Sequence, residues 1–69
     1  EPKERFSKNL RKARLEAGLS QEALGDASDL HRTEVSLLER GARDPRLSTI
    51  VRLAGGLGVS PKDLLDDIN

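Results

Sequence analysis

The side chains that could take part in molecular recognition are concentrated in the middle of this 69-residue sequence, between His31 and Arg46. Arginine can donate two hydrogen bonds to guanine, hydroxyl groups can bond to base edges, and leucine can pack against a thymine methyl group. If Val35 and Leu38 face inward on a helix, a step of about 100° per residue turns the positions beside them outward. Those positions are Thr33, Ser36, Leu37 and Arg40, with Arg32 in the first turn. By itself this spacing indicates an ordinary solvated helix face. Together with the motifs that surround it along the chain, it favours contact with the major groove of DNA.

Further polar side chains flank this stretch. Arg43 and Arg46 lie in the following loop, where they could bind phosphate or act only as solubilising groups. His31 could cap the helix or contact phosphate, and a lone histidine is a poor metal candidate. We predict base reading by Arg32, Thr33, Ser36 and Leu37, and DNA-backbone contacts by His31, Arg40, Arg43 and Arg46.

The overall charge does not support this prediction. Twelve Lys and Arg residues balance twelve Asp and Glu residues, so the chain has no general attraction for a polyanion. The distribution is uneven, however. Basic residues cluster at Arg11, Lys12 and Arg14 and at Arg40, Arg43 and Arg46, while acidic residues crowd the end at Asp63, Asp66 and Asp67. One face could therefore be basic and another acidic.

The sequence lacks the residues that several classes of function require. The sequence has no Cys, and we find no metal-ligand cluster, Gly-rich phosphate loop or carrier-type serine. We therefore expect no enzyme activity, no metal and no cofactor. Charged residues interrupt every apolar stretch well before the about 20 residues that a membrane span needs, and we find no secretory signal. We expect a cytoplasmic protein with no membrane partner.

Helical periodicity predicts the elements that position these residues. A first helix is predicted over residues 3–17, where Gly18 ends it, and Ser20 is a suitable N-cap for a short second helix. The third helix follows Leu30 and ends at Gly41. Their apolar residues are Phe6, Leu10, Ala13 and Ala17 in the first helix, Ala23, Leu24 and Ala27 in the second, and Val35 and Leu38 in the third.

Two more helices complete the prediction. Gly58 ends a fourth helix, and Ser60-Pro61-Lys62-Asp63 resembles a capping box that starts a fifth. The apolar residues are Leu47, Ile50, Leu53, Ala54 and Leu57 in the fourth helix, and Leu64, Leu65 and Ile68 in the fifth. We predict an all-α, compact five-helix bundle that forms one domain over residues 1–69, with room for a single core.

Short motifs along the chain point to a family. They are Gly18-Leu19-Ser20-Gln21, Leu24-Gly25, the run from Val35 to Gly41 (VSLLERG), Pro45, Leu53-Ala54, and Leu57-Gly58-Val59-Ser60. In this order and spacing, the segment from Leu10 to Leu65 resembles the Cro/cI phage-repressor (XRE) helix-turn-helix domains, which have the lambda-repressor-like fold. The resemblance implies a sequence-specific transcriptional regulator of double-stranded DNA.

The resemblance also assigns roles to individual residues. Gln21 matches a glutamine that anchors a DNA phosphate, and Arg14 and Glu39 match two residues that form an ion pair beneath the surface. Three departures from the family pattern are Gly25, Asp29 and Leu37. Gly25 replaces the more usual Ala and either permits a close helix crossing or is merely tolerated. Asp29 replaces a turn Gly, and Leu37 replaces a polar residue and either packs on a thymine or makes no contact.

The resemblance further implies a homodimer on a pseudo-palindromic operator, because one recognition helix reads only a few base pairs. Val51, Leu65 and Ile68 are candidates for an apolar dimer surface, although all three could instead be buried in the small core. A further C-terminal domain could instead supply the dimer. The alternative function is a helical protein-interaction module of the antitoxin or regulatory-subunit type, which zero net charge and Leu37 favour.

Overall fold

The computed structural model describes residues 1–68, and over this range it contains five helices and no strand. The helices are α1 (Pro2–Glu16), α2 (Gln21–Ser28), α3 (Arg32–Glu39), α4 (Leu47–Leu57) and α5 (Pro61–Leu64). The predicted all-α, five-helix architecture is confirmed, with α1 shifted by one residue from its predicted range. None of these helices is long and apolar enough to span a lipid bilayer.

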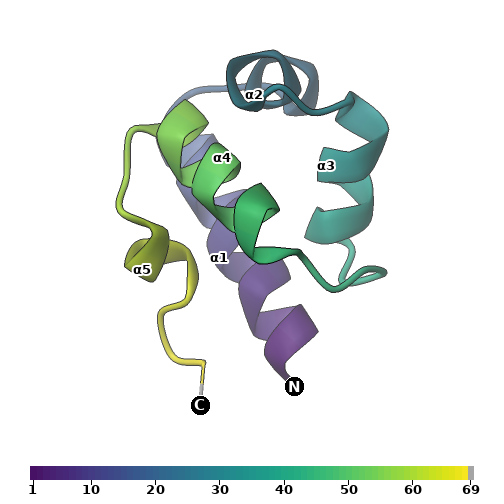
Figure 1. The fold of residues 1–69 in the computed structure, drawn as a ribbon, viewed down its shortest axis with the longest axis vertical. Helices are drawn as coiled ribbons and strands as arrows, with labels where there is room; N and C mark the ends of the chain where they lie inside the picture. The colour runs from purple at the N-terminus through teal and green to yellow at the C-terminus, as the bar shows by residue number, and fades with distance from the viewer. Residues whose placement is uncertain (69) are drawn as a thin grey trace.

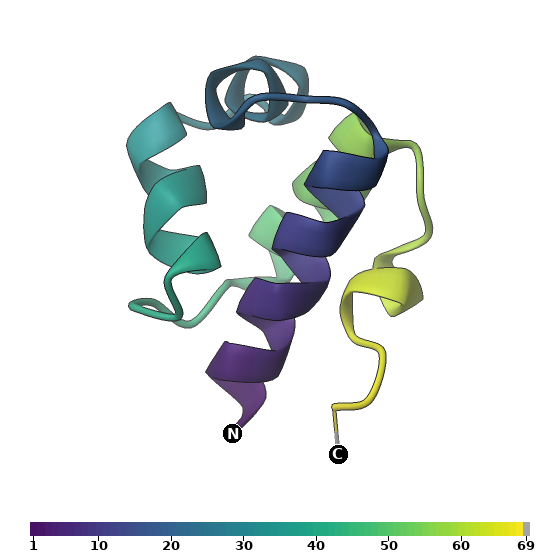
Figure 2. The ribbon, with the colours of Figure 1, turned by 180° about the vertical axis from the view of Figure 1, so that it is seen from behind.

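The helices surround one apolar core. In Figure 1, α2 lies across one end of the molecule, with α3 and α5 on opposite sides. The α2 helix packs against α3 and α4, and α5 packs against α1 and α4. The opposite view shows α1 running along the long axis, and α1 also packs against α3 (Figure 2). The buried apolar residues are Phe6, Leu10, Leu24, Val35, Leu38, Ile50, Leu53, Ala54 and Leu64.

Local hydrogen bonds end the helices where the sequence predicted. The backbone N–H of Leu19 donates to Arg14 O at 3.2 Å, and that of Leu30 donates to Gly25 O at 2.8 Å. These bonds require a left-handed residue just before the donor, which is Gly18 at φ 72° in the first case and Asp29 at φ 57° in the second. Aspartate tolerates this conformation better than most residues, so it can replace the glycine that the family pattern has in the turn.

Three apolar residues predicted to face the core are exposed instead: Ala17, Ala27 and Leu47. Leu47 is the largest of them and is 75% exposed. It lies two helical turns before the buried Ala54 and shares its angular direction, so the periodicity identified the correct side of α4. Periodicity says nothing about how far along a helix its neighbours extend. In this fold the core reaches Ile50 but not Leu47 at the start of α4, so Leu47 lies beyond the edge of the core.

The short helix α5 is held by a side chain of α1. Asn9 Nδ2 donates hydrogen bonds to the carbonyl oxygens of Leu64 at 3.0 Å and Asp66 at 2.8 Å. At its other end, the backbone N–H of Ser60 donates to Asp63 Oδ2 at 3.0 Å, as in the predicted capping box. This clamp buries Leu64 and leaves Leu65 exposed on the surface.

Candidate nucleic-acid interface

The α2–turn–α3 unit is held in place by caps and by one close backbone approach. Ser20 Oγ accepts a hydrogen bond from Ala23 N at 2.9 Å, so it caps α2 as predicted. His31 Nδ1 accepts one from Thr33 N at 3.0 Å, so His31 caps α3. A Cβ atom at Gly25 would lie 2.6 Å from Leu30 O, which supports the close-packing explanation for this glycine. The close neighbour is the turn after α2 rather than the body of α3.

The four predicted base-reading residues share the side of α3 that faces away from the core. Arg32 and Thr33, in the first turn, are exposed. Ser36 and Leu37, one turn later, are half-buried, whereas Val35 and Leu38 are fully buried as predicted. The first turn of α3 is therefore the most accessible part of this surface, and the apolar Leu37 contributes only a partly exposed side chain.

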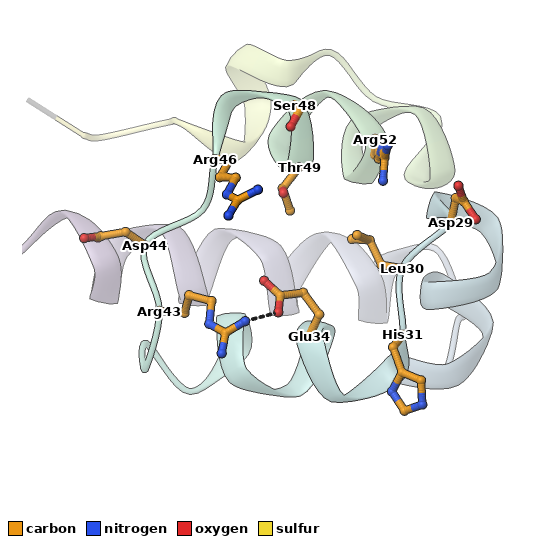
Figure 3. Close-up of a pocket in the computed structure, with 10 residues that line it drawn as sticks. All are labelled: Asp29, Leu30, His31, Glu34, Arg43, Asp44, Arg46, Ser48, Thr49 and Arg52. Carbon is orange, nitrogen blue, oxygen red and sulfur yellow. Dashed lines mark hydrogen bonds and ion pairs between the residues drawn. The ribbon is translucent and has the colours of Figure 1, made fainter.

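An open groove runs beside this surface between α3 and α4 (Figure 3). Arg43 and Arg46, from the connecting loop, line it together with Arg52 of α4. Arg46 is the N-cap residue of α4, and its side chain makes no capping hydrogen bond, so the first-turn N–H groups of α4 lack a side-chain cap. Guanidinium groups next to such N–H groups can bind phosphate.

Arg52 is a groove residue that was not predicted from the sequence. It shares one side of α4 with Ser48 and Thr49, which also line the groove. Their spacing at i, i+1 and i+4 places them on a common helix face, and this was the available signal. The sequence alone did not show that this face of α4 lies opposite α3.

The candidate phosphate ligands differ in their surroundings. Arg40 is exposed at the end of α3. Gln21 is half-buried, and its Nε2 donates to Glu39 Oε1 at 3.2 Å. The guanidinium of Arg43 is bonded to the carboxylate of Glu34. The sequence therefore located candidate groups near α3, but not their internal partners.

Arg14 and Glu39 form an ion pair beneath the α2–α3 unit. Arg14 Nε lies 2.6 Å from Glu39 Oε2, and Arg14 Nη2 lies 2.9 Å from Glu39 Oε1. The side chains are 11% and 4% exposed. Arg14 Nη1 also donates to Leu19 O at 2.9 Å. The hydrogen bond to Glu39 raises the pKa of Arg14 above its ordinary value, although burial acts in the opposite direction. This pair ties α1 to the end of α3.

Comparisons with known proteins agree with this geometry. The Helix-turn-helix family model (HTH_3) matches residues 10–64. The chain is 47% identical to the control protein C.BamHI of Bacillus amyloliquefaciens, over 88% of this chain and 76% of that protein. It is 43% identical to the control protein C.SmaI of Serratia marcescens, over 91% and 75% of the two chains.

A solved structure gives the same result. The restriction-modification controller protein C.AhdI from Aeromonas hydrophila superposes with a TM-score of 0.88 at 40% identity, covering 90% of this chain and 94% of that one. The family-model match to residues 10–64 covers most of the chain and includes both helices of the α2–turn–α3 unit. The chain therefore belongs to the helix-turn-helix (HTH_3) family of sequence-specific, DNA-binding transcriptional regulators.

Proposed function

We propose that this chain is the control protein of a restriction–modification system and binds a pseudo-palindromic operator as a homodimer. The relatives C.BamHI, C.SmaI and C.AhdI are control proteins or restriction-modification controller proteins, and their similarity to this chain supports the assignment. The observation that carries the DNA-binding part is the exposed first turn of α3, which follows the turn and presents Arg32 and Thr33. Helices in this position enter the major groove with their first residues against the bases.

In this proposal, the groups divide into two sets. Arg32, Thr33, Ser36 and Leu37 read bases, whereas Gln21, His31, Arg40, Arg43 and Arg46 position the domain on the sugar–phosphate backbone. Gln21 uses one N–H of its amide on Glu39 and retains a second for phosphate. His31 uses Nδ1 for its cap and retains Nε2. Neither internal bond therefore removes the residue from the backbone set.

Substitutions in the two sets should have different signatures. The preferred site is first selected from a random duplex pool and then compared with its single-base variants over a range of salt concentrations. Arg32→Ala and Ser36→Ala should each cost about 1–3 kcal/mol and relax the preference at particular base pairs. Arg43→Ala should weaken binding to all sequences alike and reduce the salt slope by up to about one unit. Unchanged base preferences in both α3 variants would exclude α3 as the reader and favour a protein partner.

An exposed apolar surface is available for the dimer. Val51 and Leu65, two of the three predicted candidates, are exposed, whereas Ile68 packs partly against the core. Leu47 precedes Val51 by one turn on α4 and adds to the surface. Leu65 shares a small apolar groove with Pro45, two residues before Leu47. We define Leu47, Val51 and Leu65 as the apolar surface on which two copies associate.

Val51→Glu should weaken self-association about tenfold or more, because the dimer would then bury an unpaired carboxylate. Sedimentation equilibrium with and without operator would measure the change. Leu15→Glu is the matched control, since Leu15 is an exposed apolar residue on α1. Equal effects of both substitutions, or one-to-one binding of the wild type to an asymmetric site, would contradict the proposed dimer.

A further inference from the structure

The groove beside α3 contains an internal partner for one of its cations. Arg43 Nη1 donates to Glu34 Oε1 at 2.5 Å, and Figure 3 shows the two side chains meeting on the α3 side of the groove. The Glu34 side chain is 24% exposed and that of Arg43 is 53% exposed. The pair therefore lies at the surface, where it can open at low cost.

The groove as a whole is electrically balanced. Its arginines are Arg43, Arg46 and Arg52, and its carboxylates are Asp29, Glu34 and Asp44. Of these carboxylates, only Glu34 is paired with a groove arginine within residues 1–68. Glu34 also lies in the first turn of α3, where the helix dipole favours a negative charge.

We infer that Glu34 competes with DNA phosphate for Arg43 and thereby lowers the affinity of the domain for every duplex, whatever its sequence. This inference rests on the proposed backbone role of Arg43. A carboxylate and a phosphate accept hydrogen bonds from the same guanidinium N–H groups. When Arg43 turns to a phosphate, the Glu34 carboxylate loses its partner and stays close to a polyanion. Both consequences oppose binding, and neither depends on base sequence.

The test compares Glu34→Gln, Arg43→Ala and the double variant on two duplexes, the selected operator and an unrelated sequence of equal length. Glu34→Gln should strengthen binding about two- to fivefold on both duplexes, because breaking an exposed ion pair changes an equilibrium constant by about this factor. The slope of log affinity against log salt should become steeper by up to about 0.9, the contribution of one neutralised phosphate. In the Arg43→Ala background, the gain should fall to about that of a distant acidic residue, because only the repulsion between the carboxylate and the polyanion remains.

Glu22→Gln is the matched control, because Glu22 is the first-turn acidic residue of α2. It removes the same charge without releasing Arg43, so it should change affinity less than Glu34→Gln does. The inference is overturned if Glu34→Gln leaves affinity unchanged, or if the gain is equally large without Arg43. It is also overturned if Glu34→Gln weakens binding to the operator alone, because Glu34 would then accept a hydrogen bond from a cytosine. A wild type with no preference for the operator would refute the proposed base reading, whereas the inference about Glu34 is decided on the unrelated duplex.

Discussion

Replacing Arg14 with methionine should lower the free energy of unfolding by about 3–5 kcal/mol, the usual cost of removing one partner of a buried ion pair. The Glu39 side chain is 4% exposed, so its carboxylate would stay desolvated without the guanidinium. The carbonyl oxygen of Leu19 would lose the hydrogen bond from Arg14 as well. Denaturant unfolding followed by circular dichroism would measure the loss.

Two controls separate loss of the ion pair from a general effect of the methionine. Lys12→Met changes an exposed basic residue on the same helix and should alter stability by less than about 0.5 kcal/mol. Arg14→Met combined with Glu39→Met removes both charges and should recover much of the stability, since apolar groups can replace a buried pair. A loss below about 1 kcal/mol for Arg14→Met alone would be typical of a surface pair and would contradict this account.

The adjacent glycines of α4 should respond to alanine in opposite directions. A Cβ atom at Gly56 would collide with Ser28 Oγ and lie 3.1 Å from the carbonyl carbon of Ala27, because α2 and α4 approach closely there. Gly56→Ala should therefore destabilise the domain by about 1–3 kcal/mol, as overpacking does. A Cβ at Gly55 would meet no atom within 4 Å, so Gly55→Ala should stabilise the domain by about 0.4–1 kcal/mol. Thermal and denaturant unfolding of both variants would measure the difference.

Ser28 provides a further check on this contact. Its Oγ is buried without a hydrogen-bond partner among the described residues. Ser28→Ala alone should therefore be close to neutral, and it should recover part of the loss in Gly56→Ala by removing the nearest atom. Equal and small effects of alanine at positions 55 and 56 would show that α2 and α4 can separate without cost.

Local interactions explain why much of the fold could be predicted from the sequence. The left-handed residues Gly18 and Asp29 end helices through bonds to residues at most five positions away. The Ser20 cap likewise depends on near neighbours. The buried faces of α1 and α3 follow from a fixed rotation per residue, which identified Phe6, Leu10, Val35 and Leu38. The pairing of Arg14 with Glu39, 25 residues apart, was predicted only through resemblance to a family.

Contacts between elements that are distant along the chain were decided only by the tertiary structure. The exposure of Leu47 depends on how far the neighbouring helices reach, and the clamp of Asn9 on Leu64 joins positions 55 residues apart. The groove combines charged residues from separate elements: Glu34 comes from α3, Arg43 from the loop after it and Arg52 from α4. Composition records the equal number of charges but not which of them meet. By itself the sequence determined where α3 begins and ends and which of its faces is exposed, because helix ends and faces depend on near neighbours. The partners of the arginines beside α3 depend on side chains that only the packed fold brings together.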